Sequence, residues 1–523
     1  MSLLLKAFPD GRPRSPRASY RPRTAVVLAL VAALVVVVLP LGSAAQAREK
    51  PRHRHAHHAV HHRAHHRTHH RKHAAAKRVK ASRAHKKKPR RPRIVGQPAR
   101  NYAIPQGSFF SFPNKGKKAR QVIRGRVLAT IQSVWGGPRD AYGAPRPGNG
   151  IIRLATWSFD DWAVARALVA AKKRGVSVQI VGAKKANYGH ASWAWLRKKL
   201  GPQLFRPRYP ATNTMWSFAR QCRGACRGRF GTAHSKYFLF DNVGARHVRH
   251  IAVQTSMNLT TFASSGQWNQ AQVTYSPAVW NDFNVIFRQT RLNRPVAQPY
   301  RVKRYGYIVD YFFPRYGVTP ATDPVSSILN GIKSCYGATA GGTGRTRINI
   351  IQYAIYGDRG NWIARRLRYL WEHGCDVAII YSVASRPVLS ILRSGSGRGA
   401  IPMRQSVITN GYGIIMDYNH SKWMTIVGRW GTKPDSYITF SGSANWSSTT
   451  LGDDEQMQRI DGRGTAAAHL SNFAATWRQS SSHMPGYGIL PSITGRTIPY
   501  FARDVPETAP TWGHGVFKYM TPD

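Results

Sequence analysis

A short pair of basic residues occurs twice in this chain, and each copy is followed by a second polar motif. The first pair is His234 and Lys236, and the second is His420 and Lys422. The distance from the histidine to the asparagine of the following Ser-x-Asn is 24 residues in the first copy and 25 in the second. The residues of these Ser-x-Asn motifs are Ser256, Asn258, Ser443 and Asn445. Two copies with matching spacing indicate a duplicated functional site.

The spacing within each pair has a chemical meaning. Residues i and i+2 of a β-strand point to the same face, so we expect the imidazole of His234 and the ammonium of Lys236 to project together. Two such faces, brought together with the asparagines, would supply two imidazoles, two ammonium groups and two carboxamides. This set can bind a tetrahedral anion and move protons without a metal ion.

This arrangement resembles the phospholipase D superfamily, whose signature is His-x-Lys-x4-Asp followed by Gly-Ser-x-Asn. The resemblance covers roughly residues 105–500. The first copy matches in its histidine, lysine and Asp241, but Thr255 stands where glycine is expected. The second copy has the expected glycine at Gly442, but Val427 replaces the aspartate. In the family that aspartate mainly supports local structure, so its loss bears on rigidity more than on chemistry.

The resemblance implies an α/β fold of two similar phospholipase D-like α/β/α sandwich domains, packed with pseudo-twofold symmetry around an active site at their interface. It implies that His234 attacks phosphorus to form a phosphohistidine and that His420 is the general acid and base. Lys236, Lys422 and the two asparagines would hold the non-bridging oxygens. No metal and no cofactor is expected, and a monomer is expected because both copies lie in one chain.

A catalytic imidazole also needs a partner for its other ring nitrogen, which in the family is a carboxylate after the Ser-x-Asn. In the second half the matching stretch contains Glu455, which we predict orients the ring there. In the first half the matching residues 266–270 contain no acid, so an amide would hold that ring and stabilise its protonated form less. This difference predicts a weaker first-half nucleophile or reversed roles for the two histidines.

The chain also shows an internal repeat of strand, helix and strand. Each unit has a buried apolar run, an amphipathic helix that ends near glycine, and a second apolar run, which predicts a parallel βαβ crossover. The expected segments are 151–159, 160–173 and 176–183 in the first half, and 348–356, 361–372 and 375–382 in the second. Between the halves, residues 291–316 are expected to form a linker or surface loop.

The charge of the chain is extreme, at +58, and points to anionic partners. Residues 48–93 alone hold 18 Lys or Arg and one acid, with repeated histidine pairs, which predicts a disordered basic tail. We expect the tail to adhere to an anionic membrane or cell wall, although a purely solvated basic surface would have the same composition.

The N-terminus predicts export. Several arginines precede an apolar run over residues 24–41, and Ala45-Gln46-Ala47 fits a cleavage site. A retained membrane anchor is the alternative. The predicted organisation is a signal peptide or anchor at 1–47, a disordered tail at 48–100, domains at 101–295 and 296–505, and a C-terminal tail at 506–523.

Four cysteines agree with an oxidising compartment. An even number in an exported chain suggests two disulfides, most simply Cys222–Cys226 and Cys335–Cys375. Zinc binding is the competing interpretation, but these pairs lack the usual spacing of zinc ligands.

Three hypotheses about function follow. The leading one is a secreted phosphodiesterase that hydrolyses phospholipid head groups. The second is a nuclease of the same superfamily, because the basic body of the chain would suit nucleic acid. The third is a non-catalytic binder of anionic surfaces built on a degenerate enzyme fold.

Overall fold

The structure is a computed structural model that describes residues 95–203, 214–395, 397–410, 415–480, 489–491 and 497–499. All of these residues belong to one compact unit, Lys87–Asp523. The predicted signal or anchor at 1–47, the C-terminal tail at 506–523 and residues 48–94 of the tail predicted at 48–100 lie outside the described residues. Within the described part of the chain, no helix is both long and apolar enough to cross a bilayer.

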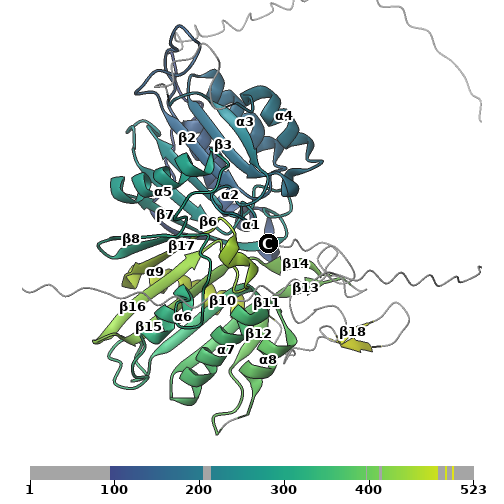
Figure 1. Ribbon diagram of the computed structural model, residues 1–523, viewed down its shortest axis with the longest axis vertical. Helices are drawn as coiled ribbons and strands as arrows, with labels where there is room; N and C mark the ends of the chain where they lie inside the picture. Colours follow the sequence, from purple (N-terminus) through teal and green to yellow (C-terminus); the bar gives the residue numbers. More distant parts are fainter. Residues whose placement is uncertain are drawn as a thin grey trace, which may run out of the picture. The chain divides into compact units, whose positions relative to one another are not determined.

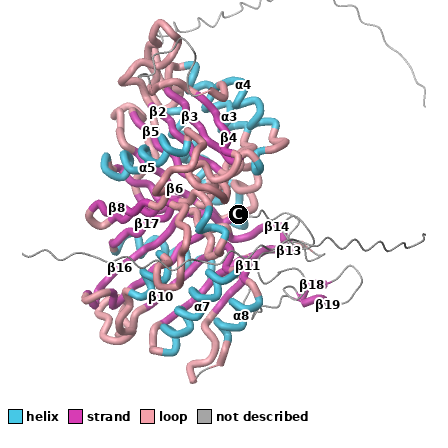
Figure 2. The backbone as a smooth tube through the Cα atoms, in the orientation of Figure 1, coloured by secondary structure: helices cyan, strands magenta, loops and turns pink. Residues whose placement is uncertain are grey.

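Two mixed β-sheets organise the described residues, so the chain is an α/β protein as predicted (Figures 1 and 2). The first sheet has the order β13-β14-β7-β6-β5-β2-β3-β4, with β1 paired to β7. Its strands are β1 Gly107–Ser111, β2 Ile151–Thr156, β3 Ser177–Ala183, β4 Phe218–Cys222, β5 Tyr237–Asp241, β6 Ile251–Thr255, β7 Gln267–Tyr275, β13 Val407–Thr409 and β14 Ile415–Asn419.

The second sheet has the order β12-β11-β10-β15-β16-β17-β9-β8. Its strands are β8 Arg301–Tyr305, β9 Ile308–Phe312, β10 Arg347–Ile355, β11 Asp376–Ala384, β12 Met403–Gln405, β15 Lys422–Trp430, β16 Lys433–Gly442 and β17 Gln456–Asp461. A separate short pair is formed by β18 Ile489–Pro491 and β19 Thr497–Pro499.

The two sheets repeat one topology. The path β7-β6-β5-β2-β3-β4 of the first sheet corresponds in order and direction to β17-β16-β15-β10-β11-β12 of the second. In both, the predicted βαβ crossover is confirmed, because β2 pairs with β3 in parallel and β10 pairs with β11 in parallel. The duplication in the sequence is therefore a duplication of the fold.

Helices cover both faces of each sheet. They are α1 Gly116–Arg120, α2 Val122–Ser133, α3 Trp162–Lys173, α4 Ala191–Leu200, α5 Pro277–Thr290, α6 Pro324–Asn330, α7 Gly357–Glu372, α8 Arg386–Arg393 and α9 Arg463–Trp477. Strand alternation explains the layers: in β5, Phe238 and Phe240 belong to the core beneath α2, α3 and α4. Tyr237 and Leu239 belong to the core beneath α5. In the second sheet, α7 and α8 cover one face, while Trp423 meets Phe473 of α9 on the other.

Two connections differ from the sequence prediction. Residues 291–316 are not only a linker or surface loop, because they contain β8 and β9, which pair with each other and attach to β17 of the second sheet. In the other direction, β14 crosses back and pairs in parallel with β7 of the first sheet. One strand pair of the second half, β13 and β14, thus extends the sheet of the first half.

Both predicted disulfides are present, Cys222–Cys226 and Cys335–Cys375. With all four cysteines bonded to one another, the zinc interpretation is wrong for these residues. The second disulfide ties the loop before β10 to the start of β11, and the first closes the turn after β4 that leads to His234.

Candidate active site

The two His-x-Lys motifs lie at matching places in the two sheets. His234 and Lys236 directly precede β5, while Lys422 opens β15 just after His420. The expectation of one shared face is confirmed for the first pair, since Lys236 Nζ lies 2.7 Å from His234 Nε2 and 2.9 Å from its carbonyl oxygen. Lys422 Nζ donates in the same way to the carbonyl of His420, at 3.0 Å.

All four motif side chains are buried, with at most 2% of their surface exposed. Two of them also pack against aromatic rings. Trp157 lies edge-on to the His234 ring, with 5.8 Å between centroids, and Tyr353 lies 4.8 Å from the His420 ring. A low-dielectric setting of this kind strengthens each charge interaction within the site.

The partner of each imidazole comes from the opposite half of the chain. His234 Nδ1 donates to Glu455 Oε1 at 2.5 Å, whereas His420 Nδ1 donates to Asn269 Oδ1 at 3.1 Å. The prediction that Glu455 orients the second-half ring is therefore wrong, and so is the expectation that the first-half histidine lacks a carboxylate. The error arose because distance along the chain was used to pair groups, whereas in the folded chain each imidazole is bonded to a residue of the other half.

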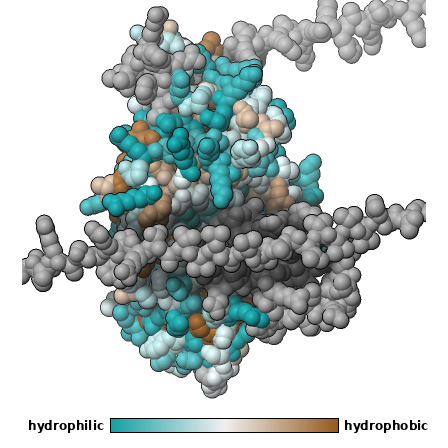
Figure 3. Space-filling view, turned by 45° about the vertical axis from the view of Figure 1, so that its right-hand side comes forward, coloured by the Kyte–Doolittle hydropathy of each residue, from teal (hydrophilic) through white to brown (hydrophobic). Residues whose placement is uncertain are grey.

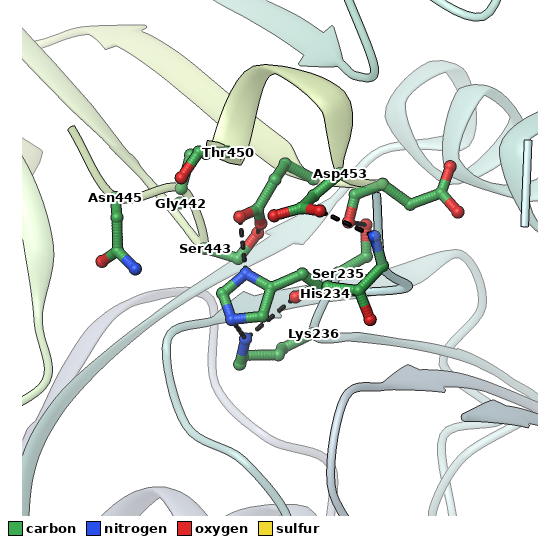
Figure 4. Close-up of polar contacts among 12 residues, drawn as sticks. His234, Ser235, Lys236, Gly442, Ser443, Asn445, Thr450 and Asp453 are labelled. Carbon is green, nitrogen blue, oxygen red and sulfur yellow. Dashed lines mark hydrogen bonds and ion pairs between the residues drawn. The ribbon is translucent and has the colours of Figure 1, made fainter. Parts of the chain in front are cut away.

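Figure 4 shows the result for His234, whose ring lies between a carboxylate on one edge and the Lys236 ammonium on the other. An ionised carboxylate only accepts hydrogen bonds, so the proton of the neutral ring is on Nδ1 and the lone pair is on Nε2. The ring is thus oriented with Nε2 toward Lys236, whose ammonium group would also bind an anion arriving there.

The predicted serines position these partners. Ser443 Oγ donates to Glu455 Oε2 in a short hydrogen bond, and Ser256 Oγ donates to Asn269 Oδ1 at 2.8 Å. Asn258 and Asn445 are buried at the ends of the same motifs, with 3% and 0% exposure. The serines therefore orient the groups that hold the imidazoles, and the asparagines remain the candidates for contact with substrate.

Two glutamines that sequence analysis missed join the halves. Gln456 accepts from the backbone N–H of Lys236 and donates to its carbonyl, both at 3.1 Å. Gln270 does the same for Lys422, at 3.1 and 3.2 Å. Each His-x-Lys strand is thus clamped by an amide of the other half. The sequence contained a sign of this duplicated clamp, because a glutamine directly follows both Asn269 and Glu455.

Asp241, predicted as a site residue, has a different role. It lies at the far end of β5 from Lys236, where it accepts from Arg249 Nη2 at 3.0 Å and from the His250 N–H at 3.2 Å. In the second half, Val427 is 2% exposed and packs in an apolar cluster with Ala466. Both residues therefore support local structure, by ion pairing in one half and by packing in the other.

Two further acids precede Glu455 and anchor it. Asp453 accepts from the Thr232 N–H at 2.7 Å, and Asp454 accepts from the backbone N–H groups of Cys226 and Arg227. Burial raises the pKa of Asp453 to about 7 and that of Asp454 to about 6. The disulfide loop of the first half is in this way docked beside the carboxylate that orients His234.

Comparison with known proteins gives a family match for the first half of this site. Residues 149–291 match the family model described as "Cardiolipin synthase, PLD-like domain". A search of curated proteins returned no match.

Several solved structures are similar. Phosphatidylserine synthase of Haemophilus influenzae has 11% identity and a TM-score of 0.45, over 74% of this chain and 90% of that chain. The phospholipase D family member Nuc of Salmonella typhimurium has 25% identity and a TM-score of 0.23, over 35% and 91%. Polyphosphate kinase of Porphyromonas gingivalis has 14% identity and a TM-score of 0.43, over 70% of this chain and 49% of that chain, so the chain spans about half of that kinase.

The family-model match contains His234, Lys236, Asn258 and Asn269, and the second half repeats its strand order and its His-x-Lys and Ser-x-Asn motifs. The resemblance to the phospholipase D superfamily is therefore confirmed over residues 149–291, which match a PLD-like domain.

Proposed function

We propose that this protein is a phospholipase D, which hydrolyses phospholipid head groups through a phosphohistidine intermediate on His234. The observation that carries the proposal is the crosswise pairing of the two imidazoles. His234 donates to a buried carboxylate, and His420 donates to a neutral amide. The two histidines therefore have different electrostatic surroundings within one site, which suits two different roles.

In the first step, the lone pair of His234 Nε2 attacks phosphorus and the bond from phosphorus to the head-group oxygen breaks. His420, protonated, donates its Nε2 proton to the departing oxygen. Positive charge develops on the His234 ring, and the Glu455 carboxylate stabilises that charge. The amide of Asn269 stabilises the charged His420 ring less, and this favours donation of its proton.

In the second step, an oxygen nucleophile attacks the same phosphorus. His420, now neutral, takes the proton from water, the bond from phosphorus to His234 Nε2 breaks, and phosphatidic acid is released. Lys236 and Lys422, with Asn258 and Asn445, supply donors to the non-bridging oxygens while negative charge builds up in both steps.

A lipid substrate is favoured by the presence of both motif copies in one chain, since nucleases of this type are often single-copy chains that dimerise. The description of the matching family model, which names cardiolipin synthase, agrees with phospholipid chemistry. The third hypothesis, a degenerate binder, rested partly on a missing carboxylate, and the pairing of Glu455 with His234 removes that argument.

A nuclease is the second candidate, because the surface is strongly basic. Few acids offset this charge at the surface, because most carboxylates in the described part of the chain are buried or half-buried. The exposed ones there are Asp358, Glu372 and Asp435. The face seen in Figure 3 is mostly hydrophilic, with scattered apolar residues. A cationic surface would suit a nucleic acid, an anionic membrane or a cell-wall polymer. Export is part of the proposal, since two disulfides favour an oxidising compartment.

The test is an assay of the purified full chain on phosphatidylcholine, phosphatidylethanolamine and plasmid DNA, each with and without EDTA. We expect release of head group in EDTA, and loss of turnover by several orders of magnitude in His234→Asn and in His420→Asn. His373→Asn, at the exposed end of α7, is the matched control and should keep wild-type activity. DNA cleavage without lipid turnover would move the function to the nuclease candidate, and a requirement for a divalent ion would contradict the mechanism.

A further inference from the structure

Beside the motif residues, a groove runs along one edge of the first sheet. The parallel strands β2 and β3 end here, and the segments that follow them line two pockets. The inner pocket, of about 290 Å³, is lined by Trp157, Asn258 and Phe262 among others. The outer pocket, of about 280 Å³, is lined by Lys184 and residues of α4. His190 lines both pockets, so they are neighbours at this residue, and the two together are called the groove below.

The inner pocket adjoins the site described above. Its Asn258 belongs to the first Ser-x-Asn, and its Trp157 contacts the ring of His234 and lies below the ammonium of Lys236. A group that continues from a phosphate bound at His234 would therefore enter this pocket. Its walls combine the aromatic rings of Trp157 and Phe262 with the carboxylate of Asp160, which also accepts from the Thr261 N–H. Aromatic faces beside a hydrogen-bond acceptor suit a ring that bears hydroxyl groups, and the carboxylate disfavours an anion.

The outer pocket has the opposite charge. Lys184 and Arg197 line it, and its lining contains no acidic residue. Arg197 Nε is buried without a hydrogen-bond partner among the described residues, so this guanidinium has donor capacity that the described protein groups do not use. The first residue of α4, Ala191, also lines the pocket, and no side chain caps that helix end. The positive end of the helix dipole adds to the two cations.

His190 lies where the two pockets meet. Its Nδ1 is 3.1 Å from the carbonyl oxygen of Phe159, which can only accept, so the ring carries a proton on Nδ1. Its Nε2 is therefore an acceptor in the neutral ring and a donor in the charged ring. The groove thus changes along its length from an aromatic section with one carboxylate to a section with two fixed cations and no acid.

From this sequence of groups we infer that the groove binds a substrate head group in which a hydroxylated ring separates the scissile phosphate from a second phosphate. The ring would occupy the inner pocket, and the second phosphate would pair with Lys184 and Arg197. Each pocket is near the lower end of the usual size of a small-molecule site, which fits a compact head group. The inference rests on the proposed function, because it places the scissile phosphate at His234.

The experiment compares two matched pairs of substrates that differ only in the second phosphate. The lipid pair is phosphatidylinositol 4-phosphate and phosphatidylinositol, and the nucleotide pair is thymidine dinucleotide with and without a 5′-phosphate. The measured quantity is the ratio of kcat/KM within each pair, for the wild-type chain and for Lys184→Ala/Arg197→Ala. Lys198→Ala is the matched control, because this exposed lysine lies on α4 outside the lining of the groove.

We expect the wild-type chain to prefer the phosphorylated lipid by about tenfold or more, since two charge-assisted contacts are at stake. The preference should fall to about one in the double variant and stay unchanged in Lys198→Ala. A preference confined to the nucleotide pair would assign the groove to nucleic acid and overturn its assignment to a lipid head group. No preference in the wild-type chain, or a preference that survives the double variant, would overturn the inference.

A parallel binding measurement separates failure of the inference from failure of the proposed function. Calorimetry with inositol 1,4-bisphosphate and inositol 1-phosphate uses the same protein and needs no turnover. Tighter binding of the bisphosphate by a chain that cleaves none of the substrates would refute the proposed function and support the groove. Equal binding of both compounds would overturn the groove whatever the activity.

Discussion

Replacing Glu455 by glutamine tests the crosswise pairing most sharply, because it removes one charge and little else. Glu455 is 1% exposed, and His234, to which it is bonded, is fully buried. A hydrogen bond to a charged group contributes about 1.5 to 3 kcal/mol. If the hydrogen bond from His234 to Glu455 stabilises the charged ring only as phosphorus is attacked, losing that free energy corresponds to a decrease in kcat of about 10- to 150-fold.

The matched change in the other half is Asn269→Ala. This residue gives His420 only a neutral hydrogen bond, of about 0.5 to 1.5 kcal/mol, so the expected decrease is about 2- to 12-fold. Stopped-flow assays with a chromogenic phosphodiester would measure the burst of the first step and the steady state separately. Glu455→Gln should slow the burst, while both variants keep the wild-type thermal unfolding midpoint to within a few degrees. Equal effects of the two changes, or a larger effect of Asn269→Ala, would refute the reasoning.

Three further predictions concern stability and chemistry. Burial raises the pKa of Asp310 to about 7, so between pH 4 and 7 the folded state holds a proton that the unfolded state releases. The free energy of unfolding should therefore fall as pH rises from 4 to 8, by an amount on the order of 2–4 kcal/mol. Asp310→Asn should remove most of this loss, as measured by urea titrations at each pH. Replacing Cys335 and Cys375 by serine should lower the free energy of unfolding by about 4 kcal/mol, and replacing Cys222 and Cys226 should lower it by about half as much. The second change should also lower kcat, because the backbone of Cys226 donates to Asp454, which directly precedes Glu455. An unchanged kcat in that variant would contradict this role. Added ethanol should yield phosphatidylethanol as well as phosphatidic acid. If no phosphatidylethanol forms at molar ethanol concentration, a covalent intermediate that an alcohol can attack is excluded.

The fold could be predicted from the sequence where the signal was local. The helix predicted at 160–173 is α3, with Asp161 as its cap, and the following strand is β3. The helix predicted from residue 361 begins earlier, at Gly357, and includes a second glycine. That glycine, Gly360, lies where a Cβ would come within 3.1 Å of Val388, so it allows close packing and does not mark a loop.

The candidate site could be predicted only as far as its repeated motifs. His234 and His420 were identified by spacing, because each copy is local in sequence. The partner of each ring could not be assigned in this way, since it depends on how the two sheets face each other and on the crossing of β14 to β7. The amide clamp of Gln456 on Lys236 was missed for the same reason, as it joins residues 220 positions apart.

The central claim is that the two histidines have separate roles and that His234 forms the covalent bond to phosphorus. The most direct measurement is rapid acid-free quenching during turnover, followed by proteolysis and mass spectrometry of the peptide that carries the phosphatidyl group. We predict a phosphatidyl group on His234 in the wild-type chain, and none in His234→Asn. A phosphatidyl group on His420, or turnover with no covalent intermediate and with inversion at a chiral phosphorus, would contradict this account.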